Sequence, residues 1–257
     1  MKKYLILTTV IILSAFTAIQ AQEYKLAKSS GKLVINLSSV KVEGYNGSEI
    51  VISSDRGDRE EDPRAKGLRP INGSGVIDNT GVGVNVTDKG ATVEVTGVTT
   101  RNGQIKIMVP KGISVSYTYQ KVDNAGKAHF NNLESELEIS VLHNNVELEN
   151  VTGPMSIKTV YGSVDAKFSD NIKGPVSIAS IYGHVDVAIP VATKANIKMN
   201  TSYGEILAAA DLKIELEKNT NAEMISYSNK VTGKLNGGGL DMTLRSDYAK
   251  IYLRKTN

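Results

Sequence analysis

Two carboxylates at matched positions are the residues of this sequence best placed to do chemistry. Asp165 and Asp186 lie 21 residues apart, in the related segments YGSVDA (161–166) and YGHVDV (182–187). On adjacent strands they would lie about 5 Å apart, the separation of the two catalytic carboxyl groups of a retaining glycosidase. Each is flanked by apolar residues, and the third copy of the segment has Leu207 in this place. We therefore expect outward-facing, solvated carboxylates, with a catalytic pair as the alternative.

Three tyrosines recur at the same 21-residue interval, and each is followed by glycine. Stacked one above the other, the rings would form a ladder along one edge and offer flat apolar faces with polar tips. A hydroxyl residue two positions earlier would add polar groups at the same pitch, and glycine would allow a bend with positive φ. On a purely structural reading the tyrosines only mark a corner. The candidate ligand-binding edge consists of Tyr161, Tyr182 and Tyr203, and the hydroxyl residues are Thr159, Ser180 and Thr201.

The remaining sequence contains no recognisable catalytic or cofactor motif. It has no cysteine, which excludes disulfides and thiol chemistry, and it lacks a phosphate-binding glycine loop, a serine elbow and a His-Glu-x-x-His pair. His129, His143 and His184 are isolated in the sequence, so no metal site is expected. The net charge is only +3, too small for the basic surface that binds nucleic acid. The sequence predicts no catalytic residues, no cofactor, no metal and no enzymatic activity.

A 21-residue repeat organises the elements that would position these residues. GPMSIKTV (153–160) aligns with GPVSIASI (174–181) and, more loosely, with ANIKMNTS (195–202). Within each copy apolar and polar residues alternate, which is the period of a β-strand. Equivalent positions also keep their apolar or polar nature from one copy to the next, so that they form columns when the copies stack. Val164, Val185 and Ile206 form one inward column. The pattern predicts an all-β, single-domain parallel β-solenoid (β-helix-like), with two short strands per coil joined at Tyr-Gly.

The repeat weakens towards both ends of the chain. His143-Asn144 replaces Tyr-Gly in one upstream coil, residues 102–119 read as strand, turn and strand, and Tyr227 and Tyr248 mark further coils downstream. The polar segment at about 54–81 carries a dense run of both charges and is expected to be an inserted loop that is mobile and protease-sensitive over 54–66.

The N-terminus has the layout of a secretory signal peptide. Residues 1–21 begin with Lys2 and Lys3, continue with an apolar run to about Phe16 and end at Ala21. The run is shorter than the roughly 20 residues of a membrane-spanning helix. We expect cleavage after Ala21, so that residues 22–257 form the exported β-solenoid domain, without a membrane span in the mature chain.

Several segments resemble the bacterial putative-adhesin domain family, a group of exported β-solenoid proteins of unknown function. They are the VPKG turn (109–112) after QIKIM, the run VELENVTGPMSIKTVYGSVDAKF (146–168) and the repeated Tyr-Gly corners. The stretch GLRPINGSGVIDNTGVGVNV (67–86) is similar to Bacteroidetes-type members. The resemblance covers most of residues 30–255. It implies a β-solenoid with an adhesion role and transfers no catalytic residue.

These observations favour an exported, non-enzymatic protein that presents a repetitive surface to an envelope protein or glycan. The alternatives are a polysaccharide-acting enzyme on the same scaffold and a purely structural envelope protein. The C-terminal sequence IYLRKTN contains no anchor motif, so a periplasmic or secreted location is expected. The identity of the partner and the oligomeric state stay open.

Overall fold

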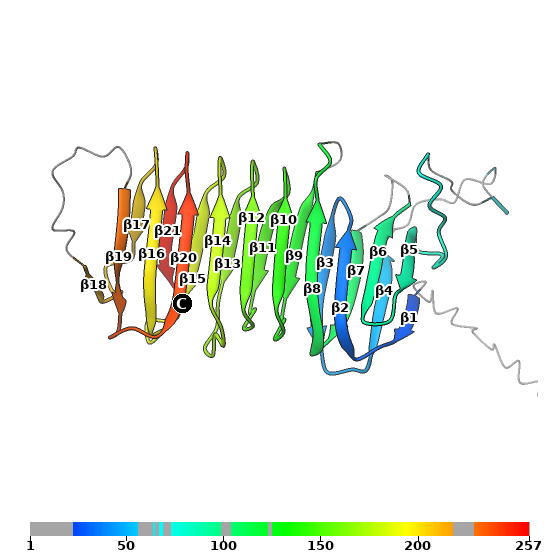
Figure 1. The fold of residues 1–257 in the computed structure, drawn as a ribbon, viewed down its shortest axis with the longest axis horizontal. Helices are drawn as coiled ribbons and strands as arrows, with labels where there is room; N and C mark the ends of the chain where they lie inside the picture. The colour runs from blue at the N-terminus through cyan, green and yellow to red at the C-terminus, as the bar shows by residue number, and fades with distance from the viewer. Residues whose placement is uncertain are drawn as a thin grey trace, which may run out of the picture.

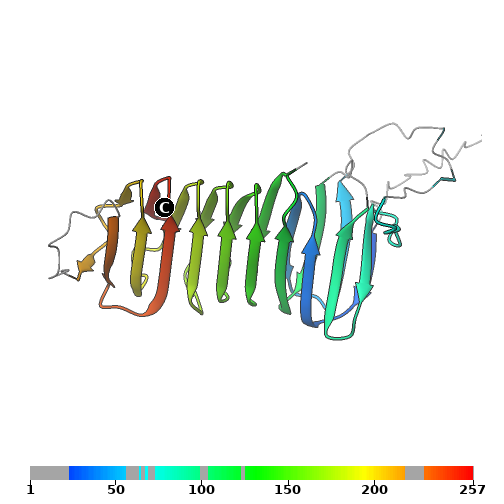
Figure 2. The ribbon, with the colours of Figure 1, turned by 45° about the horizontal axis from the view of Figure 1, so that its top comes forward.

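The computed structural model of the chain describes residues 23–55, 64, 67–68, 73–98, 104–122, 125–217 and 229–256. Within these ranges all regular elements are β-strands, which form two mixed sheets, as Figure 1 and Figure 2 show. In the same ranges no helix is long and apolar enough to cross a membrane. The predicted signal peptide (1–21), Tyr227 and half of the predicted loop at 54–81 lie outside the described residues.

The first sheet, sheet A, contains ten strands. Their spatial order is β1 (Glu23–Ala27), β4 (Glu49–Asp55), β7 (Gln104–Pro110), β3 (Val40–Tyr45), β9 (Lys127–Asn131), β11 (Asn145–Glu149), β13 (Val164–Lys167), β15 (Val185–Ile189), β21 (Ile251–Lys255) and β17 (Ile206–Ala208).

The second sheet, sheet B, contains eleven strands. Their spatial order is β18 (Ile214–Leu216), β19 (Asn229–Leu235), β16 (Ala195–Thr201), β20 (Leu240–Ser246), β14 (Val176–Ser180), β12 (Met155–Thr159), β10 (Leu137–Val141), β8 (Gly112–Tyr119), β2 (Ser30–Asn36), β6 (Thr92–Gly97) and β5 (Val84–Asp88).

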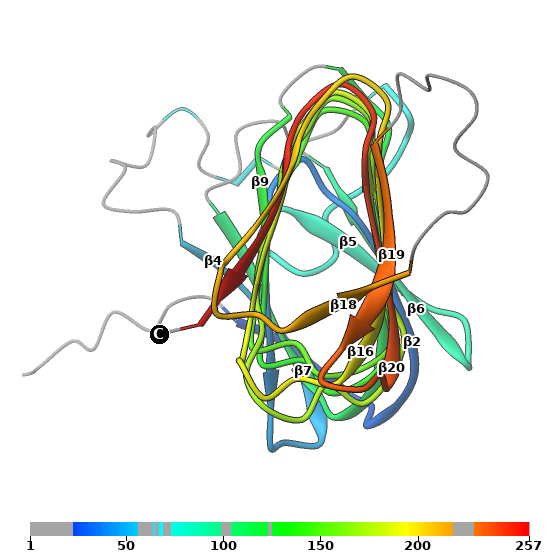
Figure 3. The same cartoon turned by 90° about the vertical axis from the view of Figure 1, so that its left-hand side faces the viewer.

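A strand of sheet B followed in the chain by a strand of sheet A forms one coil of the stack. In the centre, β10–β11, β12–β13 and β14–β15 lie side by side, and their strands pair in parallel and in register. Met155 and Ile157 of β12 are buried between the sheets while Lys158 is exposed, as the alternating sequence requires. The two facing sheets, seen end-on in Figure 3, enclose one continuous hydrophobic core.

The prediction of a uniformly parallel stack in chain order is wrong at both ends. The coil β20–β21 lies between β14–β15 and β16–β17, because β20 pairs with both β14 and β16. At the other end, the coil β2–β3 lies between β6–β7 and β8–β9. Antiparallel pairs then complete both ends of the stack, which is why the sheets are mixed.

The predicted inward column is correct in part. Val164 pairs with Val185, and both are fully buried. Ile206 does not follow Val185, because Ile251 of the inserted coil pairs with both of them. The interval between neighbouring coils also varies: Ala128, Val146 and Val164 are register partners at 18-residue spacing, and only the next step is 21 residues.

Candidate functional site

An aromatic ladder runs along the edge where sheet-B strands pass into sheet-A strands, the upper edge in Figure 1. Neighbouring rings are parallel, with interplanar angles of 7–16° and centroid separations of 4.6–5.0 Å. The rings of the ladder are, in spatial order, His143, Tyr161, Tyr182, Tyr248 and Tyr203.

The structure therefore places all three predicted tyrosines in one ladder but corrects their order. Tyr182 does not stack on Tyr203, because Tyr248 of the inserted coil lies between them. The sequence reasoning did not assign Tyr248 or His143 to the ladder. For Tyr248 a local signal exists: a buried hydroxyl residue stands two positions before each of the four tyrosines, and Ser246 fills this place for Tyr248.

Ring edges, rather than ring faces, form the accessible surface of the ladder. Each inner ring has a neighbour on both faces, and Tyr161, Tyr182 and Tyr248 are about half exposed. Tyr203 ends the row and is 70% exposed. The prediction that every ring offers a flat face is thus wrong for the inner rings. The ladder presents a row of phenol hydroxyls at intervals of about one strand spacing.

The hydroxyl residues beside the tyrosines do not face a ligand. Ser180 is buried; its Oγ accepts a hydrogen bond from the Gly183 N–H at 2.9 Å and donates one to the Gly162 carbonyl at 2.9 Å. Thr159 and Thr201 are also buried and accept from the corner N–H groups in the same way. The predicted role of these residues as ligand contacts is wrong, because they satisfy the backbone of the corners.

The glycine after each tyrosine is explained by close packing between coils. Gly162, Gly183 and Gly204 do not have positive φ, contrary to the prediction. A Cβ atom added at Gly183 would lie 2.1 Å from the carbonyl oxygen of Gly162, and one at Gly162 would lie 1.8 Å from that of Asn144. The corners can therefore follow one another at strand spacing only where this side chain is absent.

A groove of about 400 Å³ lies beside the ladder on the sheet-B side. Its apolar lining includes Val160, Ala179 and Ile181, and Ile181 is 37% exposed. Arg245 lines the groove and forms a two-bond ion pair with Asp247, with N–O distances of 2.7 and 2.9 Å. Lys158 also lines it and has no ion-pair partner within the described residues.

On the sheet-A side the two predicted carboxylates are register partners, as the sequence indicates. Each is engaged by a cationic or ionisable side chain: His184 lies 2.9 Å from Asp165, and the Arg254 Nε lies 2.8 Å from Asp186. Arg254 also lies over the Tyr252 ring, 5.0 Å from its centroid. Both carboxyl groups are thus engaged by neighbouring side chains, and both line a shallow hollow of about 230 Å³ on the sheet-A face.

The row continues with Glu147, which is the register partner of Asp165. A hydrogen bond and charge from Lys127, helped by His129, outweigh burial and hold the pKa of Glu147 below its usual range. Within the described ranges no group of three or more His, Asp or Glu side chains is arranged to hold a metal ion.

Comparison with known proteins gives two similar solved structures. One is a putative cell adhesion protein from Clostridium sporogenes, with 14% identity, a TM-score of 0.41 and coverage of 92% of this chain and 100% of that chain. The other is a putative adhesin from Bacteroides fragilis, with 9% identity, a TM-score of 0.37 and coverage of 93% and 98%. No protein-family profile and no curated protein matches the chain.

Proposed function

We propose that the protein is an exported, non-enzymatic β-solenoid that binds an extended cell-envelope glycan along the aromatic ladder. The observation that carries the proposal is the continuous row of five stacked rings with half-exposed edges. A stacked row is rigid, so its hydroxyls keep a regular spacing without loss of side-chain entropy on binding.

The chemistry of this edge fits a polysaccharide. Each phenol hydroxyl can both donate and accept a hydrogen bond, as sugar hydroxyls do. The neighbouring groove adds an apolar strip at Ala179 and Ile181, which suits the C–H faces of a sugar ring, and Lys158, unpaired among the described residues, adds a donor. Tyr203, at the end of the row, has the ring surface most available for stacking on a terminal sugar.

The test uses the chain that starts at Gln22 and an envelope glycan fraction in a pull-down and a titration. Replacing Tyr161, Tyr182, Tyr248 and Tyr203 together by Phe keeps the rings and removes the hydroxyls. Each lost hydrogen bond is worth about 0.5–1.5 kcal/mol, so affinity should fall by at least about tenfold. Tyr252→Phe, on the sheet-A face outside the ladder, is the matched control and should bind as the wild type does.

Three outcomes would overturn the proposal. Unchanged affinity of the quadruple variant would make the ladder a purely architectural feature. Binding that survives periodate oxidation of the fraction but not protease treatment would identify a protein partner instead. Release of new sugar ends by the purified protein would indicate an enzyme, with Asp165 and Asp186 as the first residues to replace. Export itself is checked by mass spectrometry, which should find the mature chain starting at or near Gln22.

A further inference from the structure

A second site lies on the opposite edge of the stack, where sheet-A strands pass into sheet-B strands. It exists because the coils differ in length. From β13 to β14 the chain takes three residues more than from β11 to β12, as the pairs Val146–Val164 and Met155–Val176 show. The longer turn, residues 168–175, stands beside the shorter turns that follow β9 and β11. On the far side lie Tyr45, the last residue of β3, and Asn46, which follows it.

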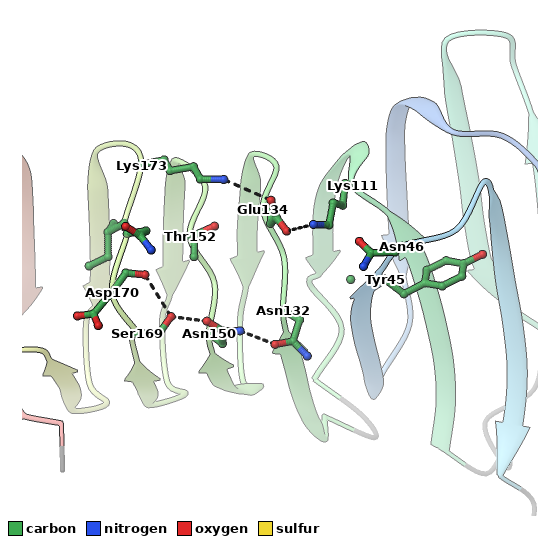
Figure 4. Close-up of a pocket in the computed structure, with 13 residues that line it drawn as sticks. Tyr45, Asn46, Lys111, Asn132, Glu134, Asn150, Thr152, Ser169, Asp170 and Lys173 are labelled. Carbon is green, nitrogen blue, oxygen red and sulfur yellow. Dashed lines mark hydrogen bonds and ion pairs between the residues drawn. The ribbon is translucent and has the colours of Figure 1, made fainter.

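The hollow between these turns has a volume of about 760 Å³, and we call it the polar trough. This volume is within the range of small-molecule sites, roughly 300–1,000 Å³. Figure 4 shows two rows of polar side chains along it. The first row is Lys173, Glu134 and Lys111, and the second is Asp170, Ser169, Asn150 and Asn132.

Contacts between coils hold both rows in place. The Glu134 carboxylate forms ion pairs with the Nζ atoms of Lys111 and Lys173, at N–O distances of 2.5 and 3.3 Å. One acidic side chain therefore connects two turns that are distant in the sequence. These two hydrogen bonds keep the pKa of Glu134 below its usual range. In the second row the Ser169 hydroxyl donates to Asn150 Oδ1, and Asn150 Nδ2 donates to Asn132 Oδ1 at 2.5 Å.

The backbone of the turns fixes where the amides lie. Asn132, Asn150 and Asn171 have φ of 55°, 53° and 76°, in the left-handed region that asparagine tolerates better than other side-chain-bearing residues. One such asparagine follows each of three consecutive sheet-A strands, β9, β11 and β13. The amides are therefore placed by the chain itself before any ligand arrives.

The lining of the trough carries no net charge, and some of its polar side chains are available to a ligand. The carboxylate of Asp170 and the amides of Asn171 and Asn46 make no side-chain hydrogen bond within the described residues. The two lysines are balanced by Glu134 and Asp170. A neutral trough does not favour an anion, and two ammonium groups disfavour a metal cation. Mixed donors and acceptors on rigid turns suit a neutral ligand rich in hydroxyl groups.

We propose that the polar trough binds a neutral saccharide, at a site independent of the ladder and on the opposite edge. The protein would then engage glycan at two edges and could link two chains. Unlike the ladder, the trough recognises its ligand through charged and amide hydrogen bonds rather than through phenol hydroxyls. Because it has two side walls, we expect it to hold a short unit of one or two sugars.

The experiment is an NMR titration of the chain that starts at Gln22 with maltose, cellobiose, mannobiose and N,N′-diacetylchitobiose, with digalacturonate as the charged comparison. At least one neutral disaccharide should shift the side-chain amide signals of Asn132 and Asn150. Asp170→Ala and Lys173→Met should each weaken that binding by about tenfold, the usual worth of a hydrogen bond to a charged group.

Lys198→Met, an exposed lysine on the sheet-B face, is the matched control and should leave the titration unchanged. The quadruple Tyr→Phe variant of the ladder should also leave it unchanged, so failure of one site is distinguishable from failure of the other. The proposal is overturned if none of the four neutral disaccharides shifts these amides, or if digalacturonate binds more tightly than they do. It is equally overturned if both trough variants bind as the wild type does.

Discussion

At Gly183, the absence of a side chain allows two neighbouring coils to pack at strand spacing. A Cβ atom there would overlap the Gly162 carbonyl, a backbone atom that cannot rotate away. We expect Gly183→Ala to lower the free energy of unfolding by about 1–3 kcal/mol, the usual cost of overpacking. Urea denaturation measures the change. Gly73→Ala, at a site with no atom within 4 Å, is the control and should stay within about 0.5 kcal/mol.

Asp78 is a second residue whose removal should be measurable. Its carboxylate accepts hydrogen bonds from the N–H groups of Thr80, Gly81 and Gly83 at 2.8–2.9 Å, in the turn before β5. Burial raises the pKa of Asp78, but these hydrogen bonds outweigh it and the pKa is lowered overall. A lowered pKa stabilises the fold above the pKa of the unfolded chain, and this contribution is lost as the pH falls.

Asp78→Ala should therefore destabilise the protein by about 1–3 kcal/mol near neutral pH. The difference between wild type and variant should shrink as the pH falls below about 4, where the carboxylate of the unfolded chain takes up a proton. Denaturation of both proteins over a pH series checks this. A difference that stayed constant down to acid pH would contradict the proposed role of the charged carboxylate.

At the scale of elements, the inserted position of β20 has a testable energetic consequence. A strand that ended the stack would be frayed, whereas β20 has a strand on each side and Leu244 is fully buried. Leu244→Ala should cost about 2–5 kcal/mol, as for a central core residue. Leu216→Ala, in the edge strand β18 with 64% exposure, should have little effect. Equal melting temperatures for the two variants would show that β20 does not occupy the inner position.

The sequence predicts the strands well but not their order, and one core column shows why. The alignment of residues 174–181 with 195–202 places Val176 beside Ile197, yet Met242 of β20 lies between them. All three side chains are apolar and buried, so the alternation of apolar and polar residues fits either strand order. The choice depends on the connection after β19, where residues 236–239 lead the chain back past β16, and no repeat pattern encodes it.

The candidate sites differ in how far the sequence anticipates them. The ladder follows from the Tyr-Gly period, because a residue repeated once per coil must form a row. The polar trough does not follow from this period, because it results from unequal turn lengths. A search for a fixed repeat length does not detect such differences. Asn132, Asn150 and Asn171 each follow a sheet-A strand, but their intervals are 18 and 21 residues.

At the scale of the whole molecule, the two candidate sites lie along opposite edges of one elongated stack, as Figure 1 shows for the strands that bear them. The edges share no side chain, and the core between them is continuous. This separation explains why variants at one edge should leave the other intact, since changes at distant sites are usually additive. The stack therefore works as a rigid spacer between two surfaces.

The insertion of β20–β21 also affects how the protein can acquire its structure. While the chain is being made, β14 and β16 exist before β20, and their matching columns allow Val176 to meet Ile197 directly. If that pairing forms, it must open before β20–β21 can insert, which breaks hydrogen bonds in both sheets. Such non-local rearrangement is slow and exposes strand edges meanwhile. Direct stacking of Tyr182 on Tyr203, the order that the repeat predicts, would in that case compete with the native order until the last coil inserts between them.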